Sequence, residues 1–290
     1  MAKLGIIGTL EAMTRKADMK LSDEKYIIKQ FKKGVGRAPN LTVPQTMNEK
    51  IQWLKLNDKN PLYVKYLDKL AVRDIITEKF GEEYLIPITG VYEDYNDIRL
   101  DGFLHPFVLK CTHGNGYYII MKDTYNQDRA KMREIMTDFM QRDYFYVGRE
   151  WPYKEIPHRI LAERYIDDRS VLELIDYCVM CFNGQVKYVS VYSDKNGIDK
   201  KCDVFNDKWE KQDVKWVYEH NPDEPKCPKT FDKMVEIASE LAKDIPFMCV
   251  DFFDVDGKLY FSEVTLYPNN GFKGFDKPEF DLQLGEMIKL

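Results

Sequence analysis

The sequence lacks the features that define several large classes of protein. No stretch of its 290 residues approaches the roughly 20 consecutive apolar residues that a helix needs to cross a bilayer. The opening segment is interrupted by Glu11, Arg15 and Lys16, so it has no signal-peptide core. Basic residues are not in excess either, and a formal net charge of -5 argues against general nucleic-acid binding. We therefore expect a cytoplasmic protein with no transmembrane segment and no nucleic-acid partner.

Cysteine and histidine are too scattered for a disulfide framework or a zinc site. The chain has six cysteines and four histidines, and only Cys178 and Cys181 have CxxC spacing. Residues three apart in a strand point to opposite faces, so we predict buried thiols rather than shared metal ligands. With 44% hydrophobic and 31% charged residues, the composition is that of a folded globular protein.

The pattern of the chain changes near residue 85. Residues 1–85 have helical periodicity, notably in "MNEKIQWLKLND" and in "VKYLDKLAVRDIITEKFG", which stops at Gly81. Beyond them come short β-branched and aromatic runs, with two helices expected at 126–142 and 230–244. We predict an α+β protein with a helix-rich region at 1–85 and a larger domain at 86–290.

The segment at residues 193–229 is polar, charged and rich in Asp, Asn and Lys. Its composition predicts a long excursion from the sheet. Such loops often act as lids or substrate-binding elements, and a plain solvated connection is equally compatible with the pattern.

The stretch "DFFDVDGKLYFSEVTLYPN", residues 251–269, predicts a hairpin whose turn contains Asp254, Asp256 and Gly257. Asp251 and Glu263 then lie on opposite strands, close enough to meet at one site. Two facing carboxylates repel each other unless a cation lies between them, and Mg²⁺ suits such hard oxygen ligands. Pairing of both acids with surface Lys or Arg is the alternative.

Two further segments have features of nucleotide binding. In "PFVLKCTHGNGYYIIMKD", Lys110 precedes a loop with Gly114 and Gly116, and backbone N–H groups of such a loop can approach phosphate oxygens. The Walker pattern is absent, so an ordinary turn is the alternative. In "RILAERYIDD", Glu163 interrupts an apolar run. A strand that leaves its sheet there could present backbone groups to adenine, or could simply be a solvent-facing edge.

In this order, the segments "YLDKLAVRDIITEKFGEEYLIP", "AERYI" and "VDFFDVDGKLYFSEVTLYP" resemble the ATP-grasp fold, and in particular its TupA-like group. The stretches "MNEKIQWLKLNDKNPLY", "GREWPYK" and "CFNGQVKYV" resemble the same group, which is named for teichuronopeptide biosynthesis. The resemblance extends over roughly residues 45–275. It implies two α+β subdomains, about 86–162 and about 163–290, that grip ATP.

The resemblance also implies roles for individual residues. Lys69 and Lys110 would contact the nucleotide phosphates, and the loop 113–117 would cover them. Glu163 and the backbone near it would contact adenine, with an acid at 167, 168 or 173 at the ribose. The implied cofactor-binding residues are Lys69, Lys110, His113, Gly114, Asn115, Gly116, Glu163, Arg164, Tyr165, Ile166, Asp168 and Glu173. Asp251 and Glu263 would hold Mg²⁺, with Thr265 beside them.

Three positions depart from the ATP-grasp pattern. Thr265 stands where an amide is common, and Cys249 and Cys178 stand where related sequences tend to have basic residues. The lost positive charge should weaken stabilisation of the transition state unless another cation supplies it. We consider Lys110, Arg149 and Lys201 as catalytic candidates, with Lys187 and Lys200 as further sources of charge.

The implied activity is that of an ATP- and Mg²⁺-dependent ligase that joins a carboxylate to an amine through an acyl phosphate. Its partners would be small or glycan-linked substrates in surface-polysaccharide synthesis, with peripheral association to the assembly system. Two alternatives stay open: a glycosyltransferase, for which "DVD" at 254–256 fits a D-x-D metal motif, and a nucleotide-binding protein without ligase activity.

Overall fold

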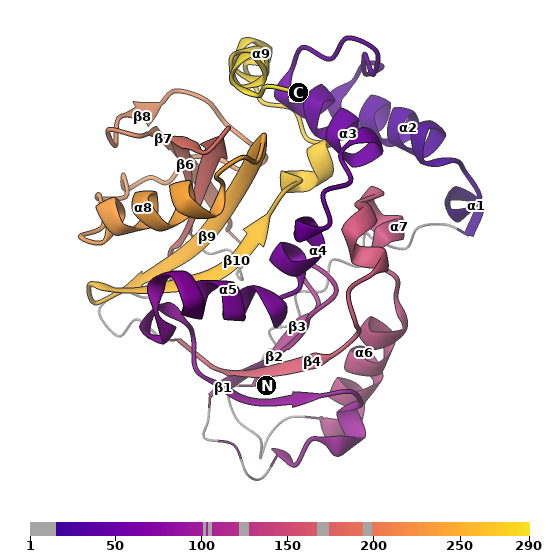
Figure 1. Cartoon of the computed structure of the whole chain (residues 1–290), viewed down its shortest axis with the longest axis vertical. Coiled ribbons are helices and arrows are strands. Elements are labelled where there is room, and N and C mark those ends of the chain that lie inside the picture. Colours follow the sequence, from indigo (N-terminus) through magenta and orange to yellow (C-terminus); the bar gives the residue numbers. More distant parts are fainter. Residues whose placement is uncertain (1–15, 101–102, 104–105, 122–127, 167–173, 194–198) are drawn as a thin grey trace. The chain divides into compact units, whose positions relative to one another are not determined.

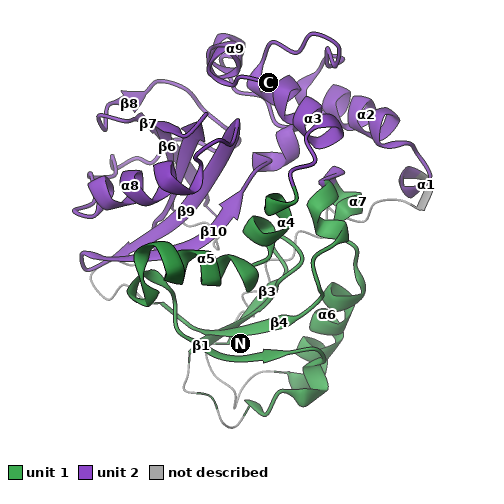
Figure 2. Ribbon diagram, in the orientation of Figure 1, with its two compact units in different colours: residues 1–14, 61–147, 151–167 green, residues 15–60, 148–150, 168–290 purple. Residues whose placement is uncertain are grey.

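The computed structural model describes residues 16–290 except 101–102, 104–105, 122–127, 167–173 and 194–198 (Figure 1). This part of the chain forms two compact units (Figure 2). Unit 1 takes residues 61–147 and 151–166 from it, and unit 2 takes residues 16–60, 148–150 and 174–290. Among the described residues, none of the helices is both long and apolar enough to cross a bilayer.

Unit 1 is built on an antiparallel sheet with the strand order β1-β4-β2-β3. Its helices are α4 and α5 before the sheet and α6 and α7 between β3 and β4. Alternate residues of β2 are buried, and Phe107, Leu109 and Cys111 form part of the core. The bounds are β1 Ile88–Tyr92, β2 Phe107–Cys111, β3 Tyr118–Met121, β4 Ile160–Arg164, α4 Leu62–Leu67, α5 Ala71–Phe80, α6 Arg129–Gln141 and α7 Phe145–Gly148.

Unit 2 contains a larger antiparallel sheet with the order β10-β9-β5-β6-β7-β8. Helix α8 (Phe231–Leu241) lies along one face of it, over β5, β6 and β9, and buries Met234, Ile237 and Leu241 at helical spacing (Figure 1). The strands are β5 Asp176–Phe182, β6 Gln185–Ser193, β7 Lys201–Asn206, β8 Lys211–Gln212, β9 Phe247–Val255 and β10 Lys258–Thr265.

The described part of unit 2 begins with short helices, one of which packs against the last helix of the chain. These are α1 (Lys16–Met19), α2 (Asp23–Val35) and α3 (Met47–Asn57), and α3 lies beside α9 (Pro278–Met287). The approach is close, because a Cβ at Gly285 would lie 2.0 Å from the Gln45 carbonyl oxygen. Two segments more than 200 residues apart in the sequence are thereby joined.

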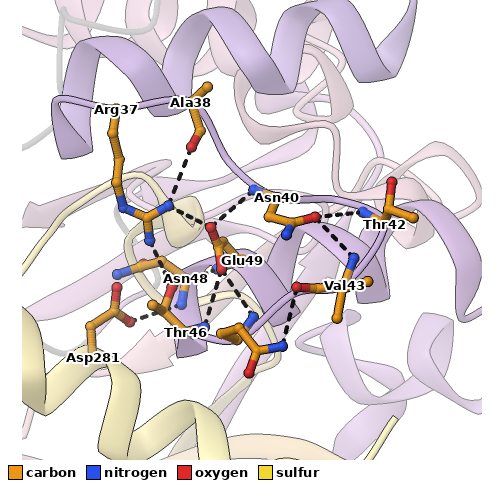
Figure 3. A network of polar contacts seen from close by, with 10 residues as sticks. Arg37, Ala38, Asn40, Thr42, Val43, Thr46, Asn48, Glu49 and Asp281 are labelled. Carbon is orange, nitrogen blue, oxygen red and sulfur yellow. Dashed lines mark hydrogen bonds and ion pairs between the residues drawn. The ribbon is translucent and has the colours of Figure 1, made fainter.

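A buried carboxylate organises the start of α3 (Figure 3). Glu49 accepts hydrogen bonds from the backbone N–H groups of Asn40, Gln45 and Thr46 and pairs with Arg37, and the Thr46 hydroxyl accepts from the Glu49 N–H in a capping box. Burial alone would raise the pKa of the Glu49 carboxyl, but these donors outweigh it and hold that pKa below its usual value. The charged carboxylate therefore stabilises the fold.

Most sequence predictions about the fold are confirmed. The α+β class holds, both CxxC thiols are buried and free, and "MNEKIQWLKLN" forms α3. The next predicted helix is two helices, α4 and α5, and α5 ends at Gly81, which has a φ of 111°. Contacts do not divide the chain at residue 85, since α2 and α3 belong to unit 2 and α4 and α5 to unit 1. The sequence-based division into a region at 1–85 and subdomains at 86–162 and 163–290 differs from these two units and stays a prediction.

The predicted excursion at 193–229 was partly wrong, because β7 and β8 lie inside it and extend the sheet of unit 2. Cys202, Val204 and Phe205 are buried. The sequence pattern did not predict a strand here because charged residues surround this short apolar run. Asp203 is buried among them and pairs with Lys211 and His220, each at 2.8 Å, which explains how an acid is accommodated in this strand.

Candidate functional site

The two predicted metal ligands of unit 2 face each other across the β9–β10 ladder. Asp251 pairs directly with Glu263, and Thr265 pairs with Cys249 two residue pairs further along the ladder. The hairpin turn contains Asp256 and Gly257, both with positive φ, as the sequence predicted. Asp251 is buried and Glu263 is half-buried.

A bulge in β10 determines this pairing. Phe261 lies opposite Phe252, and the next paired residue of β10 is Glu263, so one extra residue, Ser262, is accommodated between them. In a regular ladder Ser262 would lie opposite Asp251. The described residues contain no group of three or more His, Cys, Asp or Glu side chains able to hold a metal. Two acids alone are what Mg²⁺ uses when phosphates supply further ligands.

Three uncharged side chains, Cys178, Cys249 and Tyr192, interact with the Asp251 carboxylate. A hydrogen bond with Cys249, burial and the Asp251 charge raise the pKa of Cys178 well above its ordinary value, and burial raises that of Cys249. Burial and the same neighbours raise the pKa of the Tyr192 phenol. Asp251 therefore has the thiols of Cys178 and Cys249 as neighbours at the two positions where the ATP-grasp pattern led us to expect basic residues, and a phenol beside them.

In unit 1, Glu163 is shared by two cations. Lys110 Nζ lies 2.5 Å from one carboxylate oxygen of Glu163, and Arg73 Nη1 lies 3.4 Å from the other. Arg73 also donates to the Ile86 carbonyl oxygen at 2.8 Å. Sequence reasoning missed Arg73, although its position four residues after Lys69, at helical spacing, was a usable signal.

Lys69 contacts the glycine loop directly. Its Nζ donates to the Gly114 carbonyl oxygen at 2.8 Å. The structure thus brings one predicted phosphate ligand to the predicted phosphate-covering loop within unit 1.

The local structure explains why glycine stands at two positions of this loop. A Cβ on Gly114 would lie 2.6 Å from the Tyr117 ring, and Gly116 has a φ of 75°. Asn115 is exposed at the tip. Covering of a phosphate by this loop stays a prediction.

The His113 side chain points into the core. Its Nε2 donates to the Phe139 carbonyl oxygen at 3.1 Å, and its ring stacks on His158 with 3.6 Å between centroids. Burial, with a smaller contribution from His158, lowers the pKa of His113 to about 4, so the ring is neutral at physiological pH. Any contact of His113 with a nucleotide must therefore come from its backbone.

The segment predicted to contact adenine, residues 163–166, does not leave the sheet directly after Glu163. The backbone N–H of Arg164 donates to the Pro87 carbonyl oxygen, and that of Tyr165 donates to the Pro106 carbonyl oxygen. Ile166 is buried, and Asp168 and Glu173 lie outside the described residues. The backbone of Arg164 and Tyr165 therefore already has partners in unit 1.

The other two catalytic candidates lie in structural surroundings of unit 2. Arg149 is buried, donates to the carbonyl oxygens of Asp18 at 2.8 Å and Leu21 at 3.3 Å, and lies over the Tyr26 ring. Lys201, the first residue of β7, pairs with Asp199 at 2.7 Å. Strand β7 lies three strands from that of Asp251, so Lys201 and Asp251 are at least about 14 Å apart by strand spacing. The structure does not bring either of them to Asp251 in the way that it brings Glu263.

A left-handed turn follows the strand of Glu263. Asn269 and Asn270 have positive φ, and Lys55 donates to the Asn270 carbonyl oxygen at 2.7 Å and to that of Gly148 at 2.8 Å. The amine lies 4.4 Å from the Phe272 ring centroid. Burial lowers the pKa of Lys55 to about 7 although the Glu150 charge opposes it. This lysine, which sequence reasoning also missed, fixes the turn to α3.

Comparison with known proteins gives one match over most of the chain. The family model described as TupA-like ATPgrasp matches residues 49–289. No curated protein matches.

Solved structures give weaker likenesses. The D-alanine–D-alanine ligase of Helicobacter pylori has a TM-score of 0.44 at 14% identity, over 83% of this chain and 69% of that one. The D-alanine–D-alanine ligase of Bacillus anthracis complexed with ATP has a TM-score of 0.39 at 16% identity, over 70% of this chain. The chain covers 54% of that ligase, about half its length.

Proposed function

Since the chain belongs to the TupA-like ATP-grasp family, we propose that it is an ATP- and Mg²⁺-dependent carboxylate–amine ligase. The observation that supports this most is the direct pairing of Asp251 with Glu263 on β9 and β10. Two carboxylates directly opposite each other repel, and a cation bound between them relieves that repulsion. The donor set fits Mg²⁺, which prefers oxygen ligands and arrives with the phosphates of a nucleotide.

The residues of each unit would have separate tasks. In unit 1, Lys69 and Lys110 would bind phosphate oxygens, and Glu163 with the following backbone would orient the adenine. In unit 2, Asp251 and Glu263 would hold Mg²⁺, with Thr265 next to them. When bound, Mg²⁺ would neutralise phosphate charge and favour transfer of the γ-phosphoryl group.

The proposed reaction has two steps that balance. A substrate carboxylate attacks the γ-phosphorus, the bond to the β-phosphate oxygen breaks, and an acyl phosphate and ADP result. An amine then attacks the acyl carbon, phosphate leaves, and the nitrogen loses a proton to give an amide. Water has to be excluded in between, because it would hydrolyse the acyl phosphate. The glycine loop 113–117 is the candidate for this exclusion.

We further propose that the acid and amine are an amino acid and a uronic acid, or two amino acids, in cell-surface polysaccharide synthesis. Arg149 and Lys201 remain candidates for binding or catalysis only if substrate binding changes the contacts they make now. Peripheral association with a polysaccharide assembly system is part of the same proposal.

The neutral surroundings of Asp251 favour one alternative, a nucleotide-binding protein without ligase activity. Two thiols and a phenol supply no charge to developing phosphoryl oxygens. The D-x-D hypothesis for a glycosyltransferase gains no support, because Asp254 accepts hydrogen bonds from the Thr230 hydroxyl and the Gly257 N–H at the hairpin end.

Isothermal titration with a nonhydrolysable ATP analogue, with and without Mg²⁺, tests the nucleotide site. Wild type should bind in a Mg²⁺-dependent manner, and Asp251→Asn and Glu263→Gln should each lose that dependence. Asp256→Asn is the matched control: it makes the same chemical change at an exposed position of the same hairpin, and Asn tolerates its φ of 54°. Absence of binding by folded wild type would refute the ligase.

Catalysis needs a second measurement. Release of ADP should require Mg²⁺ and rise when an acid and an amine are supplied together. Analogue binding without ADP release across a panel of acid and amine pairs would favour the non-catalytic alternative.

A further inference from the structure

Glu163 of unit 1 is a buried acid that contacts two cations, Lys110 and Arg73. Its side chain is 5% exposed, and those of Lys110 and Arg73 are 14% and 13% exposed. One carboxylate oxygen faces Lys110 and the other faces Arg73. The three groups carry a net charge of +1 in a poorly solvated place, so each charge depends on the others.

Arg73 is the anchored member of this group. It extends from α5, and a second guanidinium nitrogen donates to the Ile86 carbonyl oxygen at 2.8 Å, just before β1. Burial lowers the pKa of Arg73 while the Glu163 charge counteracts it. An arginine stays protonated under such conditions, so its charge at Glu163 is permanent.

Lys110 is the member with another proposed task. It lies on β2 two residues beyond Val108, and Val108 pairs directly with Glu163, so the lysine and the acid share one face of the sheet. If Lys110 alone compensated Glu163, its departure to a phosphate would leave a buried carboxylate without a cation, which is strongly unfavourable.

We propose that Arg73 is a positioning residue that keeps Glu163 compensated and so allows Lys110 to exchange Glu163 for a nucleotide phosphate. This inference rests on the proposed function, because it takes Lys110 as a phosphate ligand. Arg73 acts through Glu163 and does not itself contact the nucleotide.

A double-mutant cycle separates this role from a merely structural one. Binding of the nonhydrolysable ATP analogue is measured by titration for wild type, Arg73→Met, Glu163→Gln and the double variant. Arg73→Met alone should weaken binding by about tenfold or more, whereas the same change in the Glu163→Gln background should have an effect of less than about twofold. An equal loss in both backgrounds would overturn the proposal.

A second readout needs no nucleotide. Without Arg73, the Glu163 carboxylate has Lys110 as its remaining cation of this group, so the lysine amine is held in the ion pair and is less available to a reagent. Its acylation by an amine-reactive reagent, followed by peptide mass spectrometry, should slow by about threefold or more in Arg73→Met and recover in the double variant. Unchanged reactivity of Lys110 in Arg73→Met would overturn the proposal, whether or not wild type binds ATP. Failure of wild type to bind ATP would refute the proposed function and is a separate outcome.

Two further variants control the cycle. Lys131→Met removes a cation of unit 1 from an exposed surface pair with Glu134 and should leave both readouts unchanged. If Arg73→Met does not fold, Arg73→Lys serves in its place: it keeps the charge but loses the planar fork, and should give changes of the same sign and smaller size.

Discussion

Asp251 and Glu263 are direct partners across two antiparallel strands, and the extra residue Ser262 in β10 brings Glu263 into that position. Like charges directly opposite each other oppose sheet formation. The arrangement thus has a cost to stability that only a bound cation or a further hydrogen bond offsets, and this cost can be measured.

Glu263→Gln should stabilise the metal-free protein. Removing one of the facing charges is expected to raise the free energy of unfolding by about 0.5–1 kcal/mol in buffer with a chelator. When Mg²⁺ and the ATP analogue are added, the unfolding free energy of wild type should rise to at least that of Glu263→Gln, because these ligands bind only the folded state. Thermal melts in both buffers measure this, with Asp256→Asn as control. A variant that melts lower than wild type in chelator would contradict the expectation.

Lys55 should make stability depend on pH. Its pKa of about 7 in the folded protein lies below the value of 10.5 in an unfolded chain, so the unfolded state binds the proton more tightly. Above pH 7, Lys55 loses its proton in the folded protein but keeps it in the unfolded chain, so unfolding takes up a proton. The free energy of unfolding therefore rises with pH in this range.

Lys55→Met should remove this dependence. The difference in unfolding free energy between wild type and Lys55→Met should grow by about 1.5 kcal/mol between pH 7 and 8.5 in denaturant titrations. Lys25→Met, at an exposed position of α2, should show no such trend. A constant difference across this range would mean that Lys55 stays charged in the folded protein.

Glu49 should contribute stability at neutral pH and lose it in acid. Its pKa is lowered in the folded state, so the contribution is present above the unfolded value near 4.5 and disappears as pH falls through the folded value. Glu49→Gln should cost about 1–3 kcal/mol at pH 7, since an amide cannot serve all the donors that surround it. The gap between the melting curves of variant and wild type should close toward pH 3, and a gap that persists there would argue for a packing defect instead.

Gly114→Ala should destabilise unit 1. The new methyl group would lie 2.6 Å from the Tyr117 ring and 3.2 Å from that of Tyr144, both of which are packed in the core. We expect a loss of about 1–3 kcal/mol in denaturant unfolding. Gly274→Ala is the matched control, since its nearest neighbour is a Val35 carbon at 3.9 Å. Equal stability of the two variants would mean that the loop rearranges freely.

Features coded by neighbouring residues were predicted well. The Asp256–Gly257 turn followed from turn chemistry, and the helix beginning at Met47 followed from its apolar spacing. The direct pairing of Asp251 with Glu263 also needs the extra residue in β10, which alternation alone does not predict. Predictions failed where burial depended on distant segments. The strand β7 looks polar by itself, and it becomes part of the sheet only because β6 pairs with it and because Lys211 and His220 compensate Asp203.

The sequence by itself determined the α+β class, the hairpin that carries Asp251 and Glu263, and the resemblance that the family match bears out. These depend on local periodicity and on short motifs. Only the tertiary structure decided that Arg73 shares Glu163 with Lys110, that Lys55 holds the turn after β10, and that the His113 ring lies in the core. The physical reason is that a buried charge or ring takes its partners from whichever segments fold against it, and sequence spacing carries little information about those partners.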